Sequence, residues 1–252
     1  MCANTSRNSI NDRGARLPDL AERVGLHIAT ARRMLKALVA EGLLTFDPVT
    51  KLYHLGIDLY YFGAAAHQFK IRDRCRTTLE RVARISEDTA YLVIRSGYDV
   101  LCIDRVEGTF PIRALTHNIG TRVPLGIGAG SLTLLAFSPP EQIEKIINAN
   151  KLRYPKYNNR TSDYVRAMVR EAQESGYGVS EGNVMRGAVG IGVPIRNHKG
   201  EAIAAMSVTA VSWRMNKDRR EQIAELLKSE IRAINLESMD VEYMDRKIPY
   251  LA

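Results

Sequence analysis

The alternation of apolar and polar positions between Leu17 and Leu55 predicts two helices followed by a β-hairpin. Pro18 suits the first turn of a helix that ends near Val24, and Gly25 can adopt the left-handed conformation of a sharp turn. A longer helix from Ile28 to Glu41 has two contrasting faces when its residues are spaced by about 100°. Its apolar stripe consists of Ala31, Met34, Leu35 and Leu38, and the opposite stripe consists of Ala29, Arg33, Lys36 and Ala40.

Two short strands, Leu43–Phe46 and Lys51–Leu55, complete this segment, which then has the layout of a winged helix-turn-helix over residues 17–55. Small residues and cations on one face of the second helix suit entry into the major groove of DNA. The candidate DNA contacts are His27, Ala29, Thr30, Arg32, Arg33, Lys36, Thr50, Lys51 and Tyr53. A simpler interpretation is open for each part: a plain surface helix, a solvent-exposed hairpin, and a His27 that caps the helix instead of binding a phosphate.

The pattern changes after Ser86, where short apolar and β-branched runs alternate with helical segments. The predicted strands are Thr89–Arg95, Asp99–Val106, Pro111–Thr116, Gly178–Glu181, Val189–Arg196 and Ala202–Val211. The predicted helices are one that follows the glycine-rich Gly126–Gly130 and ends at Phe137, Glu141–Asn150, Asp163–Ser175 and a closing helix capped by Asn216. Strands and helices grouped in this order favour an α+β domain with an antiparallel sheet.

Residues 56–85 are helical in composition, and we take them as the linker between the two domains. Their apolar stripes are Leu59, Phe62 and Ala66 and, further on, Cys75, Leu79, Val82 and Ala83. The second half also holds a dense run of cations: Lys70, Arg72, Arg74, Arg76, Arg81 and Arg84. Such a run is more often a solvated face or a set of ion-pair partners than a second DNA contact.

The composition is compatible with a two-domain DNA-binding protein but does not by itself identify one. A chain of 252 residues with 45% hydrophobic and 25% charged residues has room for two globular domains. The net charge of +8 suits a polyanionic partner, but residues 1–56 hold eight Lys or Arg against five Asp or Glu, a net of +3. Three cysteines without metal-ligand spacing, and no apolar run long enough for a membrane, predict a cytoplasmic protein with no membrane partner.

Catalysis finds little support in the sequence. The five histidines are scattered, no metal-ligand pair or G-x-S-x-G motif is present, and Cys102 lies within an apolar strand as a core residue would. We expect no enzyme activity, no cofactor and no metal. The glycine-rich run Gly126–Ser131 fails the dinucleotide and P-loop fingerprints, yet glycines that open a helix leave backbone N–H groups available to an anion.

Several motifs then match one family. The chain resembles the IclR family of bacterial transcription regulators from about Leu17 to about Glu237. The matching runs are LPDLAERVGL, an Arg-bearing helix that ends in EGLL, D-P-x-T-x-x-Y-x-LG, GTRVPL, GYGVSEGN, GIGVPI and EAIAAMSVTA. The resemblance implies a winged helix-turn-helix, a linker helix, a GAF-like effector-binding domain, and dimers that often pair into tetramers on DNA.

The resemblance also implies an effector site, often for a small carboxylate. The matching positions are Ala129, Gly130, Ser131, Ser180, Gly190, Ser207 and Thr209. Ser207 and Thr209 lie two apart on one strand, so their hydroxyls face the same side and can hold a ligand, unless both bond neighbouring backbone. Some family members have an acidic residue and a cysteine at positions 180 and 190, so this chain is expected to have a roomier, less polar pocket for a larger organic acid, such as an aromatic one.

A second departure concerns the beginning of the family pattern. The family has an apolar helix before LPDLAERV, whereas residues 1–16 here are polar, and we expect them to be poorly ordered. We expect an effector-binding domain over residues 86–240 and a tail over 241–252. The predicted function is a one-component regulator that binds operator DNA and a small organic acid. The alternative is a stand-alone small-molecule sensor or interaction module whose truncated winged helix no longer binds DNA.

Overall fold

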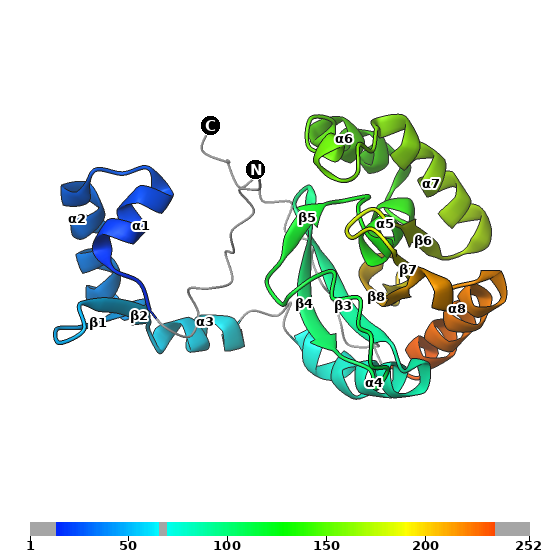
Figure 1. The fold of residues 1–252 in the computed structure, drawn as a ribbon, viewed down its shortest axis with the longest axis horizontal. Helices are drawn as coiled ribbons and strands as arrows, with labels where there is room; N and C mark the ends of the chain where they lie inside the picture. The colour runs from blue at the N-terminus through cyan, green and yellow to red at the C-terminus, as the bar shows by residue number, and fades with distance from the viewer. Residues whose placement is uncertain (1–13, 66–69, 235–252) are drawn as a thin grey trace. The chain divides into compact units, whose positions relative to one another are not determined.

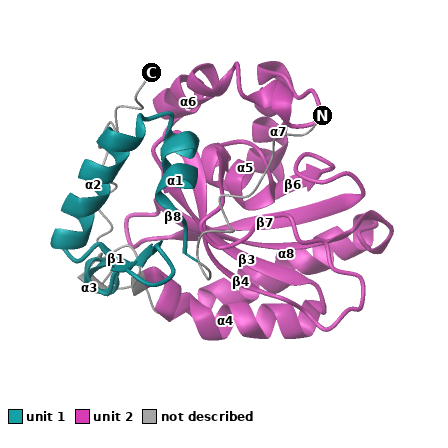
Figure 2. Ribbon diagram, turned by 60° about the vertical axis from the view of Figure 1, so that its left-hand side comes forward, with its two compact units in different colours: residues 1–69 teal, residues 70–252 magenta. Residues whose placement is uncertain are grey.

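The computed structural model describes residues 14–65 and 70–234, and the chain divides into two compact units, Met1–Phe69 and Lys70–Ala252 (Figure 2). In the first unit the elements are α1 (Leu17–Val24), α2 (Ile28–Ala40), β1 (Leu44–Asp47), β2 (Leu52–Leu55) and α3 (Asp58–Ala65) (Figure 1). Gly25 ends α1 in the left-handed conformation with φ 67°. The predicted helix, turn, helix and hairpin are therefore all present.

The apolar face of α2 is only partly covered by the described residues of this unit. Ala31 and Leu35 are buried, but Met34 is 52% and Leu38 is 36% exposed, although the sequence pattern predicts one buried stripe. On α1, Val24 is also exposed. The prediction of that stripe is therefore right for two of its four residues.

A short pairing precedes α1. The backbone N–H of Ala15 donates to the carbonyl of Tyr53 at 3.0 Å, and the N–H of Tyr53 donates back at 2.9 Å. The prediction of poor order over residues 1–16 is wrong for residues 14–16, because Ala15 pairs with the outer strand of the hairpin. The rest of that prediction, and the predicted tail over 241–252, lie outside the described residues.

The second unit is an α+β domain built on one six-stranded sheet. Its elements are α4 (Lys70–Ser86), β3 (Thr89–Ser96), β4 (Asp99–Val106), β5 (Arg122–Pro124), α5 (Ala129–Ala136), α6 (Pro140–Asn150), η3 (Tyr154–Lys156), α7 (Ser162–Ser175), β6 (Gly178–Glu181), β7 (Ala188–Arg196), β8 (Ala202–Val211), η4 (Ser212–Arg214) and α8 (Lys217–Arg232). The strand order is β5-β4-β3-β8-β7-β6 and every neighbouring pair is antiparallel. The predicted fold class is confirmed.

Helices cover both faces of this sheet (Figure 1). On one face α4 and α8 bury a core that includes Leu79, Leu92 and Leu227. On the other face α5, α6 and α7 bury a second core that includes Val93 and Leu135. Alternate residues of the central strands thus serve two cores, as the two-residue repeat of a strand requires.

The predicted linker over residues 56–85 is wrong for its second half. Cys75, Leu79 and Val82 of α4 are fully buried against the sheet, so α4 belongs to the second unit. Its cations act mainly as ion-pair partners. Arg76 forms an ion pair with buried Asp104 at 2.8 Å, and Arg72 approaches the same carboxylate at 3.3 Å. Arg76 also pairs with Glu80 one turn further along the helix.

Pro111–Thr116 is not the predicted strand. Among the described residues it pairs with no strand; instead the Tyr91 hydroxyl donates to the carbonyl of Ala114 at 3.1 Å and accepts from the N–H of Thr116 at 3.0 Å. The neighbour of β4 at this edge is the short β5. A tertiary hydrogen bond therefore holds this segment as a loop over the sheet.

Glycines let α5 lie unusually close to the sheet. A Cβ at Gly192 on β7 would stand 2.8 Å from the backbone C and O of Ala129, and one at Gly178 on β6 would stand 2.5 Å from Thr133 Oγ1. The hydroxyl of Thr133 donates to the carbonyl of Gly192 at 3.0 Å. The first turn of α5 is therefore held close against β6 and β7.

None of the described helices has the length and apolar content needed to span a bilayer.

Candidate effector cavity and DNA-binding surface

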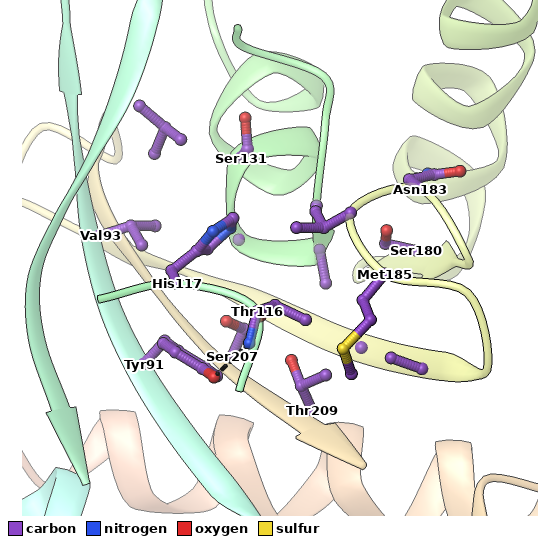
Figure 3. Close-up of a pocket in the computed structure, with 17 residues that line it drawn as sticks. Tyr91, Val93, Thr116, His117, Ser131, Ser180, Asn183, Met185, Ser207 and Thr209 are labelled. Atoms are coloured by element: carbon purple, nitrogen blue, oxygen red, sulfur yellow. Dashed lines mark hydrogen bonds between the residues drawn. The ribbon is translucent and has the colours of Figure 1, made fainter. Parts of the chain in front are cut away.

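A small cavity lies at the start of α5, between the sheet and two loops (Figure 3). It encloses about 20 Å³. All seven predicted effector residues line it: Ala129, Gly130, Ser131, Ser180, Gly190, Ser207 and Thr209. The structure brings these residues together from α5, β6, β7 and β8, although they are spread over 81 positions of the chain.

The first turn of α5 offers free backbone donors to this cavity. Gly128 is the N-cap residue and has no side chain to cap the helix. The first intrahelical bond runs from the N–H of Leu132 to the carbonyl of Gly128. By helix geometry, the amides of Ala129, Gly130 and Ser131 therefore lack an intrahelical partner. Together with the helix dipole they form a site that favours an anion.

The hydroxyl of Ser131 is already used inside the loop. It accepts from the N–H of Gly126 and donates to the carbonyl of Pro124, both at 3.1 Å. In Figure 3 this hydroxyl points away from the other polar side chains. Ser131 lines the cavity, but its side chain serves to hold the glycine-rich turn and is not available to a ligand.

The other three hydroxyls are available. Ser180 and Gly190 are cross-strand partners, as are Gly190 and Thr209, so these positions form one row across three strands. Ser207 lies two residues before Thr209 on the same face of β8. Within the described residues no hydrogen bond is recorded from Ser180, Ser207 or Thr209 side chains, so the simpler interpretation, that they bond neighbouring backbone, does not apply.

The cavity is not the roomy pocket that the sequence predicts. A Cβ at Gly190 would stand 3.0 Å from the Cβ of Ala129 and 3.1 Å from Oγ1 of Thr209, so these two side chains occupy the space that a side chain at position 190 would need. One water molecule needs roughly 10–15 Å³ of such space. An organic acid must therefore widen the cavity to enter it.

Met185 is the lining side chain best placed to move aside and widen the cavity. It lies in the loop between β6 and β7, lines the cavity, and is 37% exposed, so it separates the cavity from solvent (Figure 3). Its unbranched thioether adapts easily to a changed shape.

Asn183 is a lining residue that the sequence analysis missed. Its Oδ1 accepts from Arg160 Nε at 2.7 Å and from the Tyr164 hydroxyl at 3.2 Å, which fixes the orientation of the amide. Its Nδ2 is buried and has no hydrogen-bond partner. Asn183 thus presents an unused donor beside the cavity. The motif GYGVSEGN ends on this residue, and that signal could have identified it.

His117 and Tyr91 were missed as well. Both line the cavity, and their rings meet edge to face with centroids 5.9 Å apart. Burial raises the pKa of Tyr91, whose hydroxyl holds the loop that carries His117. Burial also lowers the pKa of His117 to about 4. Since this loop is expected as a strand from sequence alone, no local pattern indicated that His117 faces the cavity.

The buried thiols do not suit nucleophilic chemistry. Burial raises the pKa of Cys75 and of Cys102 to about 12, so both remain protonated near neutral pH. Within residues 14–65 and 70–234 no three His, Cys, Asp or Glu side chains gather in a way that could hold a metal ion.

On the first unit, the exposed face of α2 matches the predicted DNA-binding surface. Ala29, Arg32, Arg33 and Lys36 are exposed and Thr30 is half-buried. No ion pair with a described residue is recorded for the three cations. The N-terminus of α2 is capped by His27, whose Nδ1 accepts from the N–H of Ala29 at 3.3 Å, in agreement with the simpler interpretation of that residue.

The hairpin residues have partly structural roles. The hydroxyl of Thr50 donates to Asp47 Oδ2 at 2.6 Å, which closes the turn and lowers the pKa of Asp47. Tyr53 is half-buried, with its ring 4.8 Å from that of Phe46. Lys51 is exposed at the turn with φ 60°. Of the three predicted contacts in the hairpin, Lys51 is the one with a side chain free of such packing.

A helix-turn-helix with an unpaired cationic face, joined to a domain with a donor-lined cavity, defines a class of ligand-responsive DNA-binding regulators. Comparison with known families agrees. The chain matches the IclR helix-turn-helix domain over residues 11–48 and the C-terminal domain of bacterial IclR transcriptional regulators over residues 63–236. The chain therefore belongs to the IclR family of transcription regulators.

Similar proteins of known role are regulators. The HTH-type transcriptional regulator KipR of Bacillus subtilis is 28% identical, with 84% of this chain and 85% of that protein covered. BhcR of Paracoccus denitrificans is also 28% identical, with 82% and 74% covered. An IclR homologue from Microbacterium hydrocarbonoxydans, solved with 4-hydroxybenzoate, superposes with a TM-score of 0.76 at 24% identity, covering 88% of this chain and 91% of that one. This last likeness shows the fold.

Proposed function

We propose that this regulator binds operator DNA through α2 and the hairpin, and that an organic acid in the cavity of the second unit controls the binding. The observation that carries the proposal is a set of donors around one cavity that have no recorded hydrogen bond to a described residue: the first amides of α5, the buried Asn183 Nδ2 and the hydroxyls of Ser180, Ser207 and Thr209. Donors without partners in a buried place are costly unless a ligand satisfies them. Because they are all donors, or hydroxyls that can donate, the fitting ligand is an anion.

An aromatic carboxylate is the ligand class that we favour. The apolar part of the lining comes from Val93, Val100, Val184, Met185 and Ala188, which suits a ring or a short chain attached to the carboxylate. The complex of a similarly folded protein with 4-hydroxybenzoate supports this choice. The ring would take the space that Met185 occupies in the empty cavity.

A homodimer is part of the proposal, and a tetramer on DNA is a possible higher assembly. After Asp58, helix α3 consists of apolar, aromatic and small residues, and several are exposed: Tyr60 is 71% and Phe62 is 65% exposed, as are Tyr61 and, just before the helix, Ile57. A contiguous apolar surface of this kind marks an interaction site. A second copy fits it because operators bound by such helices consist of two half-sites one helical turn apart.

Coupling would follow from this arrangement. If acid binding shifts the population of domain arrangements, the spacing of two recognition helices in a dimer changes, and both can no longer fit their half-sites. We place such a regulator in the cytoplasm, where its DNA lies.

DNA binding is tested by selecting an operator from random duplexes and measuring its affinity at a fixed salt concentration. Arg33→Ala should weaken specific binding by about 1–3 kcal/mol if Arg33 contacts a base edge. Arg23→Ala, on α1, is the matched control and should change affinity far less. Failure to select any duplex, with acid binding intact, would instead favour a stand-alone sensor whose winged helix does not bind DNA.

A further inference from the structure

Among the described residues, none that lines the cavity is Asp, Glu, Lys or Arg. The polar lining residues are Tyr91, Thr116, His117, Asn183, three serines and Thr209. A carboxylate that leaves water for such a place loses much hydration energy. The N-terminus of α5 provides only about half a positive charge. The site therefore needs a further source of positive charge.

His117 is placed to supply it. Its Nδ1 is buried without a hydrogen-bond partner. Its Nε2 lies 3.3 Å from the point where a Cβ at Gly128 would stand, so the ring is beside the N-terminus of α5. Figure 3 shows the ring nitrogens turned toward the start of that helix. An anion bound to the α5 amides would lie within reach of the imidazole.

None of the ionisable groups described around His117 forms an ion pair with its imidazole, so a bound carboxylate would be its ion-pair partner. Tyr91 on β3 meets the ring with its edge, and its hydroxyl is used by the loop. Arg105 on β4 donates to the backbone carbonyl of His117 at 3.1 Å and is paired with Glu107. From α5 and the β6–β7 loop, the lining residues contribute no ionisable group. Among the described residues, no carboxylate is paired with the imidazole.

In these surroundings the imidazole of His117 is neutral near pH 7, because its pKa is lowered. Burial is the main cause that lowers the pKa of His117, to about 4, and the nearby backbone of Thr116 acts in the opposite direction. A carboxylate beside the ring acts in the opposite direction, because an adjacent negative charge favours the protonated form.

We propose that His117 takes up one proton from solvent when an organic carboxylate binds, and that the resulting imidazolium pairs with that carboxylate. This inference rests on the proposed function, since it requires an anionic effector. The proton comes to a ring nitrogen and no covalent bond between heavy atoms changes. His117 is then the residue that selects a carboxylate over a neutral amide or alcohol of the same shape.

Linked proton uptake makes affinity depend on pH. Between the pKa of free His117 and its higher value in the complex, affinity falls by up to about tenfold for each unit that the pH rises. Above the higher value the dependence ends, because binding no longer brings a proton. A neutral amide analogue should show no such dependence.

The experiment is isothermal titration of the full chain with a panel of benzoate, 4-hydroxybenzoate, pyruvate and glyoxylate at pH 6.0. Two buffers with different ionisation enthalpies are used, because the difference in heat counts the protons taken up. We expect an uptake between about one half and one proton per bound acid. His117→Gln should bind at least tenfold more weakly and take up no proton, while His54→Gln, in the first unit, should behave as wild type.

The outcomes separate the two proposals. If an acid binds without proton uptake, or His117→Gln takes up the same proton, the role of His117 is overturned and the proposed function stands. If no acid of the panel binds wild type or alters its NMR spectrum, the carboxylate effector and this inference both fail. A His117 that keeps its imidazole resonances unshifted in the complex at pH 6.0 would also overturn the inference.

Discussion

The polar side chains around the cavity divide into those already used inside the protein and those that are not. Ser131 holds the turn before α5, and Thr133 joins α5 to β7. Thr209 and Ser207 have no such recorded bond and face the cavity (Figure 3). Ser131 and Thr209 are both buried hydroxyl side chains, yet one serves the fold and the other faces the cavity. Substitutions of the two residues can distinguish these roles.

Thr209→Val and Ser131→Ala form a matched pair. Thr209→Val keeps the volume and removes a hydroxyl that only a ligand would use, so carboxylate affinity should fall about tenfold, near the net value of one hydrogen bond to a charged group. Ser131→Ala removes two internal hydrogen bonds and should lower the free energy of unfolding by about 1–3 kcal/mol. Calorimetric titration and urea unfolding measure the two effects; the reverse assignment of effects would contradict this division.

His117 also makes the stability of the folded protein depend on pH. Its pKa is about 4 in the folded protein against 6.5 for an ordinary histidine. Between these values the unfolded chain binds a proton that the folded protein does not, so stability that is fully present above pH 6.5 is lost as pH falls toward 4. The loss is at most about 1.4 kcal/mol for each pH unit.

Urea unfolding of wild type and His117→Gln at pH 7 and pH 5 isolates this effect, because all other groups are shared. Wild type should lose more stability than the variant between the two pH values. Equal losses would show that His117 titrates normally in the folded protein.

At the scale of elements, the site depends on how closely α5 approaches the sheet. Gly192 and Gly178 leave no room for a Cβ, and the atoms that a Cβ would meet at Gly192 include backbone. Backbone cannot turn aside as a flexible side chain can. The start of α5, and with it the three donor amides, is therefore positioned by glycines on β6 and β7.

Gly192→Ala should accordingly displace α5. We expect a loss of several kcal/mol in stability, typical of overpacking in a rigid core, together with loss of acid binding. Gly63→Ala on α3 is the control, since nothing lies within 4 Å of a Cβ there and alanine favours a helix. Thermal unfolding of both variants measures the difference. Two equal melting temperatures would contradict the close approach of α5.

Local signals predicted most elements, and tertiary contacts explain the misses. Asn216, the predicted cap of α8, accepts from the backbone N–H of Arg219. Thr161 caps α7 in the same way, since its hydroxyl accepts from the N–H of Tyr164. Pro111–Thr116 has the composition of a strand but is held by Tyr91, which lies far away in sequence. His117 was missed for the same reason, since its place follows from that hydrogen bond and not from its neighbours in the chain.

The family motifs predicted seven residues that lie together, and all seven line one cavity. The size of the cavity could not be predicted from these motifs. The expected roomy pocket is not present, because Ala129 and Thr209 fill the space beside Gly190. How closely a helix packs on a sheet depends on the whole core, which spacing along the chain does not reveal.

At the scale of the whole molecule, the account needs two copies of the chain. The exposed apolar helix α3 supplies a surface for pairing, so Phe62→Glu should weaken the dimer and lower operator affinity together. Leu152→Glu is the control, because Leu152 is 86% exposed at an isolated position of the second unit. Sedimentation velocity measures the assembly. A dimer that is unchanged by Phe62→Glu would exclude α3 from the interface.

The central claim is that a carboxylate in the second unit controls DNA binding by the first. The most direct measurement is the affinity of the full chain for a selected operator duplex, titrated by fluorescence anisotropy with and without the tightest acid of the panel. The account predicts that a saturating acid changes this affinity at least fivefold, in either direction, and that Thr209→Val needs about tenfold more acid than wild type for half of that change. An acid that binds the cavity and leaves operator affinity unchanged would contradict the claim.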